Sequence, residues 1–96
     1  IMIRVYLFTM DGCPHCQEMK GMLEESGIDF IVKDIDEHED EYAEYQALVE
    51  GNEYVPAFLC VELEENKVKR YGAFAPDRDY MELSEALDKV KGFIAG

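Results

Sequence analysis

The tetrapeptide Cys13-Pro14-His15-Cys16 holds the residues of this chain whose types and spacing are best suited to chemistry. Two thiols at this spacing can close a small disulfide, and a Cys-x-x-Cys motif is typical of redox dithiols. The motif follows an apolar, strand-like run and begins a helical pattern. The unpaired N–H groups and the dipole of a helix N-terminus would stabilise the thiolate of Cys13, which is the reactive form of a thiol. The sequence therefore predicts a redox-active cysteine pair.

The chain length and charge limit what this pair can serve. The 96 residues make one domain, 1–96, whose hydrophobic fraction of 48% is ordinary for a globular protein. The net charge of −13 excludes non-specific nucleic-acid binding, because the phosphate backbone would repel it, and it disfavours anionic membranes. We therefore expect no nucleic-acid or membrane partner, and we expect protein partners with a basic docking surface.

Several features favour a cytoplasmic location. The longest strongly apolar run, from Val55 to Val61, is too short to cross a bilayer. The start, Ile1-Met2-Ile3-Arg4, does not have the order of a signal peptide. Three cysteines are too few for a secreted disulfide scaffold, so we expect a reducing compartment.

The first third of the chain has the pattern of a strand–helix–strand unit. A strand is predicted over residues 3–8, a helix from Pro14 to a C-terminal Gly27, and a second strand over residues 29–35. The centre of the second strand, Phe30-Ile31-Val32, is continuously apolar. Such a run is typical of a strand covered on both faces.

Residues 34–41 hold six acidic side chains in eight positions. We interpret them as a solvated loop followed by the acidic first turn of a second helix. A calcium loop is rejected because Glu39 stands where such a loop needs glycine. Gly51 should end the second helix. Its buried residues are predicted to be Tyr42, Tyr45, Leu48 and Val49.

The last part of the chain is predicted to form a hairpin and a helix. A third strand over residues 57–61 should turn at Glu64-Glu65-Asn66 into a fourth strand over residues 68–71. A loop is expected from Gly72 to Pro76, with Asp77 as the N-cap of the last helix. The apolar face of that helix is predicted to comprise Tyr80, Leu83, Leu87, Val90 and Ile94.

The order of elements, βαβαββα, resembles the thioredoxin fold in its glutaredoxin form. The cysteine motif is followed after four residues by Lys20, a position where glutaredoxins often have a basic residue. The segment from Gly51 to Pro56 is similar to the family's glycine-x-x-threonine-valine-proline segment, with Tyr54 in place of threonine. The resemblance covers nearly the whole chain. It implies an α/β fold with a four-stranded mixed sheet and helices on both faces.

The resemblance also implies roles for individual residues in a thiol–disulfide oxidoreductase. Cys13 would be the exposed nucleophile and Cys16 the resolving thiol, with their redox properties tuned by Pro14 and His15. Pro56 would follow a cis peptide bond and lie beside the cysteines. The implied substrate-binding residues are Gly12, Lys20, Tyr54, Val55, Pro56, Phe74 and Asp77.

The source of electrons has two interpretations. The resemblance implies glutathione as the reductant, with no bound cofactor and no metal, but Glu53 is acidic where glutathione-binding members usually carry a base. The segment from Ala73 to Asp77 is similar to the phenylalanine-x-proline-aspartate loop of certain glutaredoxin-like redoxins. Those redoxins accept electrons from thioredoxin reductase and reduce ribonucleotide reductase.

Other classes of function fit the sequence less well. A structural zinc site would need a second pair of ligands, which the chain does not supply at a suitable spacing. A shared iron–sulfur cluster is disfavoured by Pro14 within the motif. Cys60, in an apolar run, is interpreted as a buried and inert thiol. A non-catalytic adaptor stays as an alternative to a monomeric reductase of protein or glutathione mixed disulfides, which we expect to be less reducing than thioredoxin.

Overall fold

The computed structural model describes residues 1–96 and contains four strands and three helices in the predicted order, βαβαββα. The elements are β1 (Met2–Thr9), α1 (Pro14–Glu25), β2 (Ile31–Asp34), α2 (Glu39–Leu48), β3 (Ala57–Glu64), β4 (Lys67–Phe74) and α3 (Leu83–Ala95). None of the three helices has the length and apolar character needed to span a bilayer.

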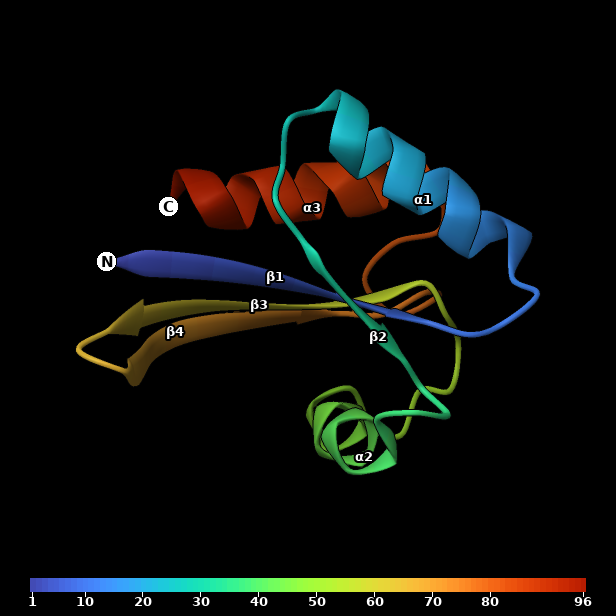
Figure 1. Cartoon of the computed structure of the whole chain (residues 1–96), viewed down its shortest axis with the longest axis horizontal. Coiled ribbons are helices and arrows are strands. Elements are labelled where there is room, and N and C mark those ends of the chain that lie inside the picture. Colours follow the sequence, from blue (N-terminus) through green and yellow to red (C-terminus); the bar gives the residue numbers. More distant parts are fainter.

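The strands form one mixed sheet, as the resemblance implied, and their order in the sheet is β2-β1-β3-β4 (Figure 1). Strand β1 pairs in parallel with β2 and antiparallel with β3, and β3 pairs antiparallel with β4. Phe8, near the end of β1, lies opposite Ala57, the first residue of β3. The loop from β1 to the cysteine motif and the loop that leads into β3 therefore lie at the same end of these two strands.

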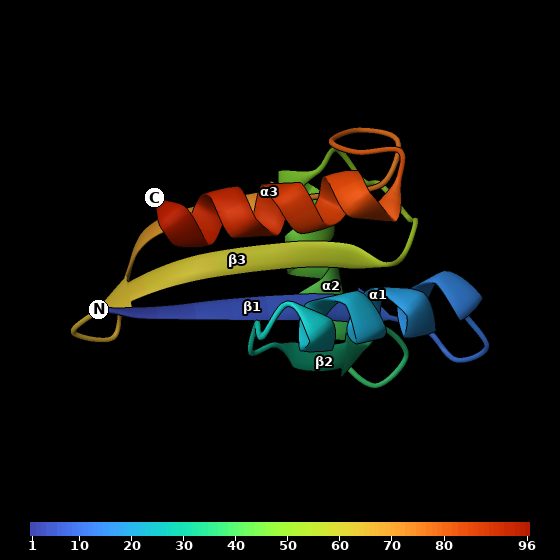
Figure 2. The same ribbon diagram turned by 90° about the horizontal axis from the view of Figure 1, so that it is seen from above.

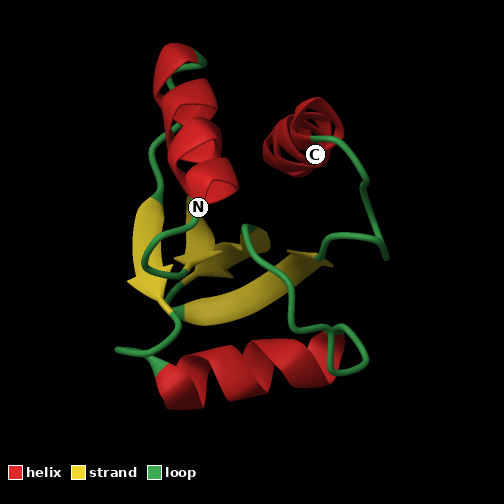
Figure 3. Ribbon diagram, turned by 90° about the vertical axis from the view of Figure 1, so that its right-hand side faces the viewer, coloured by secondary structure: helices red, strands yellow, loops and turns green.

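Helices cover both faces of the sheet, which confirms the predicted architecture. Helices α1 and α3 lie on one face and α2 lies on the other (Figures 2 and 3). The alternation of side chains along β1 supplies both layers, because successive residues of a strand point to opposite faces. Val5 and Leu7 join the core beneath α1 and α3, whereas Phe8 packs against Tyr42 and Tyr45 of α2.

Strand β2 corrects one prediction. It is shorter than residues 29–35, and Ile31 and Val32 keep 41% and 40% of their surface exposed. The prediction of a strand covered on both faces is wrong because β2 is the edge strand. An edge strand has a neighbour on one side only, so a continuous apolar run does not ensure burial.

Helix α2 begins with three acidic residues, as predicted, and ends before Gly51. Tyr42, Tyr45 and Val49 are buried, but Leu48 is 39% exposed and corrects the predicted stripe. At 3.6 residues per turn, Leu48 lies beyond Tyr45 on the side away from Tyr42, at the border of the buried face. Gly51 has a φ of 76°, the left-handed conformation that favours glycine after a helix.

The β3–β4 hairpin turns through Glu65 and Asn66, both with positive φ, as a two-residue turn of this hand requires. Strand β4 is longer than predicted and extends through Phe74, which pairs with Phe58. The expected loop from Gly72 to Pro76 is therefore wrong for its first three residues, because their backbone groups continue the ladder with β3.

The start of α3 also differs from the prediction. Glu82, not Asp77, is the N-cap, and the Glu85 carboxylate accepts hydrogen bonds from the backbone N–H groups of Glu82 and Met81. Asp77 has a φ of 65° and lies in a preceding turn, where its N–H donates to the Tyr80 carbonyl. The side chain of Asp77 thus occupies a turn position that suits the same residue type as an N-cap.

The buried face of α3 is shifted relative to the predicted face. Val90 is buried as predicted, Ile94 is 39% exposed, and Tyr80 is buried although it precedes the helix. The buried residues of α3 are Ala86, Val90 and Phe93. Helical spacing predicted the side of α3 that faces the core, but not which residues lie at the middle of the buried face.

Candidate redox site

Cys13 is the N-cap residue of α1, and Pro14 occupies the first turn of the helix. A proline fits there because the missing N–H would have no partner inside the helix. Gly12 has a φ of 71° and forms the turn that carries the chain from β1 into the helix. The sulfur of Cys13 accepts a hydrogen bond of 3.1 Å from the backbone N–H of Cys16.

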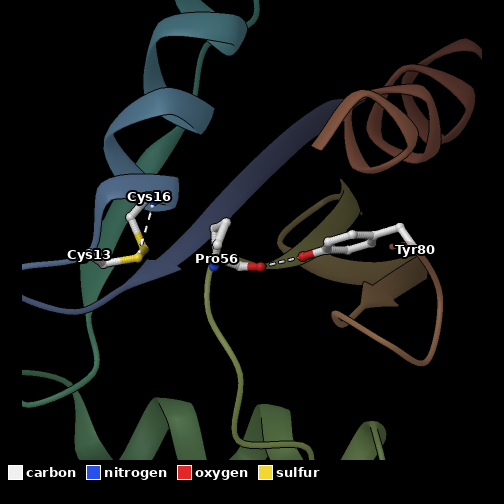
Figure 4. The surroundings of a disulfide bond; sticks show 4 residues. All are labelled: Cys13, Cys16, Pro56 and Tyr80. Carbon is white, nitrogen blue, oxygen red and sulfur yellow. Dashed lines mark hydrogen bonds between the residues drawn. A yellow bond between two sulfur atoms is a disulfide. The ribbon is translucent and has the colours of Figure 1, made fainter. Parts of the chain in front are cut away.

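Cys13 and Cys16 form a disulfide, with their Cα atoms 5.3 Å apart (Figure 4). Their accessibility differs: Cys16 keeps only 1% of its surface exposed, whereas Cys13 is half-buried. An incoming sulfur can therefore reach Cys13 more readily than Cys16. This difference fits the roles that the resemblance implied for the two thiols.

The electrostatics of the α1 N-terminus favour negative charge on the Cys13 sulfur. Unpaired backbone N–H groups and the helix dipole place partial positive charge at this end of the helix. No acidic residue occupies the first turn of α1 to oppose that effect. In the reduced protein the Cys16 N–H that now contacts the Cys13 sulfur is placed to stabilise its thiolate.

The Val55–Pro56 peptide bond is cis, in agreement with the prediction. Pro56 is buried and lies between the cysteine pair and Tyr80 in Figure 4. The Tyr80 hydroxyl donates a hydrogen bond to the Pro56 carbonyl oxygen. This bond ties the segment before α3 to the loop that precedes β3.

Further side-chain contacts hold the loops around this site. The Asn52 amide donates to the Pro76 carbonyl at 2.7 Å, and its oxygen accepts from the Tyr54 N–H at 3.0 Å. The Tyr45 hydroxyl donates to the Phe74 carbonyl at 2.8 Å. The Asn52–Pro76 bond joins two loops that are 24 residues apart in sequence, so it fixes the loop before the cis-proline turn relative to the segment that follows β4.

A groove of about 480 Å³ lies beside the cysteine motif, between α1, the cis-proline turn and residues 76–84. Three predicted site residues line it: His15, Val55 and Pro56. Sequence reasoning did not assign the other contributors to the site, which include Glu18, Met22, Pro76, Tyr80, Met81 and Glu82. The sequence indicated Tyr80 only as one residue in the apolar face of the last helix, not as part of a site.

The remaining predicted substrate-binding residues lie elsewhere. Phe74 packs against the core beneath α1 and α3, and Asp77 lies in an exposed turn next to the lining residue Pro76. Tyr54 is 59% exposed and lines a second hollow with Arg78. Gly12 is in the turn before Cys13, and Lys20 is half-buried on α1. None of these five residues lines the groove.

The third cysteine is separate from the pair. Cys60 is fully buried in the core beneath α1 and α3. Burial raises the pKa of its thiol to about 12, although Arg70 acts in the opposite direction. The predicted burial of Cys60 is confirmed, and the raised pKa disfavours its thiolate at neutral pH. No group of three His, Cys, Asp or Glu side chains converges to hold a metal ion.

The mixed sheet, the helices on both faces and a Cys-x-x-Cys pair at a helix N-terminus define a thioredoxin-like redox protein. The family model described as Glutaredoxin matches residues 5–62, so the chain belongs to the glutaredoxin family. Among solved structures, the chain is similar to thioredoxin 1 from the thermophilic eubacterium Thermosipho africanus TCF52B. The two are 20% identical, with a TM-score of 0.48 over 96% of this chain and 94% of that chain. A comparison with curated proteins gave no match.

Proposed function

We propose that this chain is a thiol–disulfide oxidoreductase that reduces disulfides in proteins, or mixed disulfides of proteins with glutathione, through Cys13 and Cys16. One observation carries the proposal: the accessible Cys13 sulfur lies at the N-terminus of α1, while its partner Cys16 is buried behind it. This arrangement supports a reaction in which one thiol meets the substrate and the other completes the exchange.

The reaction begins with the dithiol form of the protein. The Cys13 thiolate attacks one sulfur of the substrate disulfide, forming a Cys13–substrate disulfide and releasing the other substrate sulfur as a thiolate. The Cys16 thiol then loses its proton and attacks the Cys13 sulfur. The Cys13–Cys16 disulfide forms, and the second substrate sulfur leaves as a thiolate. Two electrons pass from the protein to the substrate, and the two thiolates each take up a proton.

The surroundings of the cysteines support this chemistry. The His15 side chain and the cis-proline turn line the groove into which the substrate segment would enter. We propose that the Val55 backbone pairs with that segment. Pro14 and His15 would tune the redox potential. Gly12, Lys20, Tyr54 and Asp77 are proposed to contact parts of the substrate outside the groove, and Phe74 to support its wall.

The oxidised protein must regain two electrons from a donor. Glutathione is the reductant that the family resemblance favours. One observation weighs against glutathione: the groove beside the cysteine motif contains no lysine or arginine to bind its carboxylates. The alternative donor is thioredoxin reductase, with ribonucleotide reductase as the substrate. We propose that the protein acts as a monomer in the cytoplasm, where both donors operate.

The donor assay separates these possibilities. NADPH oxidation is followed with a mixed-disulfide substrate, supplying either glutathione with glutathione reductase or thioredoxin reductase alone. Turnover only with glutathione identifies a glutathione-dependent enzyme. Turnover only with thioredoxin reductase makes ribonucleotide reductase the first substrate to test. The Cys13→Ser variant is the control and should have no activity with either donor.

A second assay, the reduction of insulin by dithiothreitol, tests the non-catalytic adaptor as an alternative. An adaptor with the same fold would add nothing to the rate at which dithiothreitol reduces insulin. A protein with free Cys13 that is inactive with both donors and with insulin would contradict the proposed function. An increase in the insulin reduction rate that the Cys13→Ser variant does not produce would support it.

A further inference from the structure

Two glutamates from different parts of the fold line the groove. Glu18 belongs to α1, two residues after Cys16, and Glu82 is the N-cap of α3. The eleven residues that line the groove include no lysine or arginine. The only basic side chain among them is His15. Two negative charges therefore flank the groove without a strong cation between them.

No lysine or arginine pairs with these carboxylates, although the Glu82 side chain also accepts a backbone hydrogen bond in the capping box of α3. Glu18 and Glu82 form no ion pair. Arg78 lies within residues 76–84 but does not line the groove, and its guanidinium pairs with Glu50 and Asp79 at 2.6 and 2.7 Å. The whole chain carries a net charge of −13, so no distant excess of positive charge compensates for the groove. A cation that enters the groove gains favourable interactions, and an anion is repelled.

Apart from His15 and Ser84, the rest of the groove is lined mainly by apolar and aromatic side chains. Pro56 and Tyr80 are buried, while the side chain of Met22 is half-buried and Met81 is 72% exposed. Methionine side chains are flexible and polarisable, so they adapt to apolar partners of different shapes. The volume of about 480 Å³ is enough for a few side chains of an extended peptide.

We propose that this groove selects protein disulfides in which the reacting cysteine has a lysine or arginine and an apolar side chain nearby. The basic side chain lies between Glu18 and Glu82, and the apolar side chain packs on Met22 and Met81. This inference rests on the thiol–disulfide exchange proposed above and names the substrate class that the exchange serves. Glutathione, a tripeptide with two carboxylates, is the poorer substrate.

The test uses three probes and the pre-reduced wild-type protein. Two are short peptides with one cysteine and a neighbouring leucine, identical except that one carries lysine where the other carries glutamate. The third is glutathione. Each cysteine is linked by a disulfide to 2-nitro-5-thiobenzoate, whose release is followed by absorbance in a single turnover. Each rate is divided by the rate of the same probe with dithiothreitol, which removes differences in intrinsic reactivity.

The lysine peptide should react about tenfold faster than the glutamate peptide at low salt, and the ratio should fall at high salt. In the Glu18→Gln/Glu82→Gln variant the ratio should fall several-fold toward one. The matched control is Glu24→Gln/Glu25→Gln, which removes two exposed carboxylates from the other end of α1. It loses the same charge and should keep the wild-type ratio.

Three results would overturn the inference while leaving the exchange reaction intact. They are equal rates for the two peptides, glutathione as the fastest probe, and a ratio that both double variants lower equally. Absence of reaction with all three probes would instead contradict the proposed exchange reaction. The proposed substrate class would then be contradicted as well. Far-UV circular dichroism and urea denaturation verify that both double variants are folded.

Discussion

The Tyr80 hydroxyl donates a hydrogen bond to the Pro56 carbonyl oxygen, which lies 24 residues earlier in the chain. Both residues are buried, and both line the groove beside the cysteine pair. The bond joins two walls of the groove that come from different loops (Figure 4). It therefore links the stability of the protein to the shape of the surface that the substrate meets.

The Tyr80→Phe variant should lose both stability and activity. Removing the hydroxyl leaves the buried Pro56 carbonyl without its partner, which costs about 1–3 kcal/mol of the free energy of unfolding. Urea denaturation measures that loss, and single-turnover rates should fall as the groove loosens. Tyr71→Phe is the control, since Tyr71 is 56% exposed on β4. Equal stability of the two variants would contradict this role of Tyr80.

Two glycine substitutions should have opposite effects on stability. A Cβ at Gly72 would lie 2.7 Å from Cζ of Phe74 and 3.1 Å from Cδ2 of Phe93, so Gly72→Ala should destabilise by about 1–3 kcal/mol. Gly21 lies inside α1, where a Cβ meets nothing within 4 Å. Gly21→Ala should stabilise by about 0.5–1 kcal/mol. Thermal unfolding measures both, and a Gly72→Ala protein as stable as the wild type would contradict the packing of β4 under α3.

Cys60 should stay unreactive in the folded, reduced protein. Burial raises the pKa of its thiol to about 12, so almost no thiolate exists at about pH 8. Titration with a thiol reagent should detect two fast thiols in the native protein and a third only after denaturation. A third thiol that reacts as fast as the pair in the native state would show that Cys60 is accessible.

Stability should fall at alkaline pH. Burial raises the pKa of Cys60 from its ordinary value of 9.0 to about 12, and burial also raises the pKa of Tyr42, Tyr45 and Tyr80. The folded state therefore keeps protons that the unfolded state releases. The stabilisation is complete below about pH 9 and declines as the pH rises toward 12, by up to about 1.4 kcal/mol per pH unit for each group.

Urea denaturation at a series of pH values from about 8 to about 11 tests this prediction. The free energy of unfolding should decrease over that range, and the Cys60→Ala variant, which lacks one of the groups, should show a shallower decrease. A free energy that is constant or rises with pH would contradict the burial of these groups.

The sequence was sufficient to predict the parts of the site that depend on local chemistry or on a family motif. The cysteine pair, the helix that begins at Pro14 and the cis bond before Pro56 all agree with the structure. The hairpin turn was also predictable, because Asn66 tolerates the left-handed conformation that such a turn requires.

The parts that failed depend on tertiary context. The exposure of Ile31 and Val32 follows from the position of β2 at the sheet edge, which no local pattern specifies. Asp77 suits a turn as well as an N-cap, so its residue type did not locate the start of α3. The role of Tyr80 depends on a partner 24 residues away, which helical spacing cannot reveal.

The most direct test of the central claim is intact-mass spectrometry of the Cys16→Ser protein after reaction with a peptide disulfide. If Cys13 attacks and Cys16 resolves, this variant accumulates one peptide adduct, which proteolytic mapping places on Cys13. The wild-type protein releases the peptide and shows the Cys13–Cys16 disulfide, and Cys13→Ser forms no adduct. An adduct on Cys60, or turnover that persists in Cys13→Ser, would contradict the account.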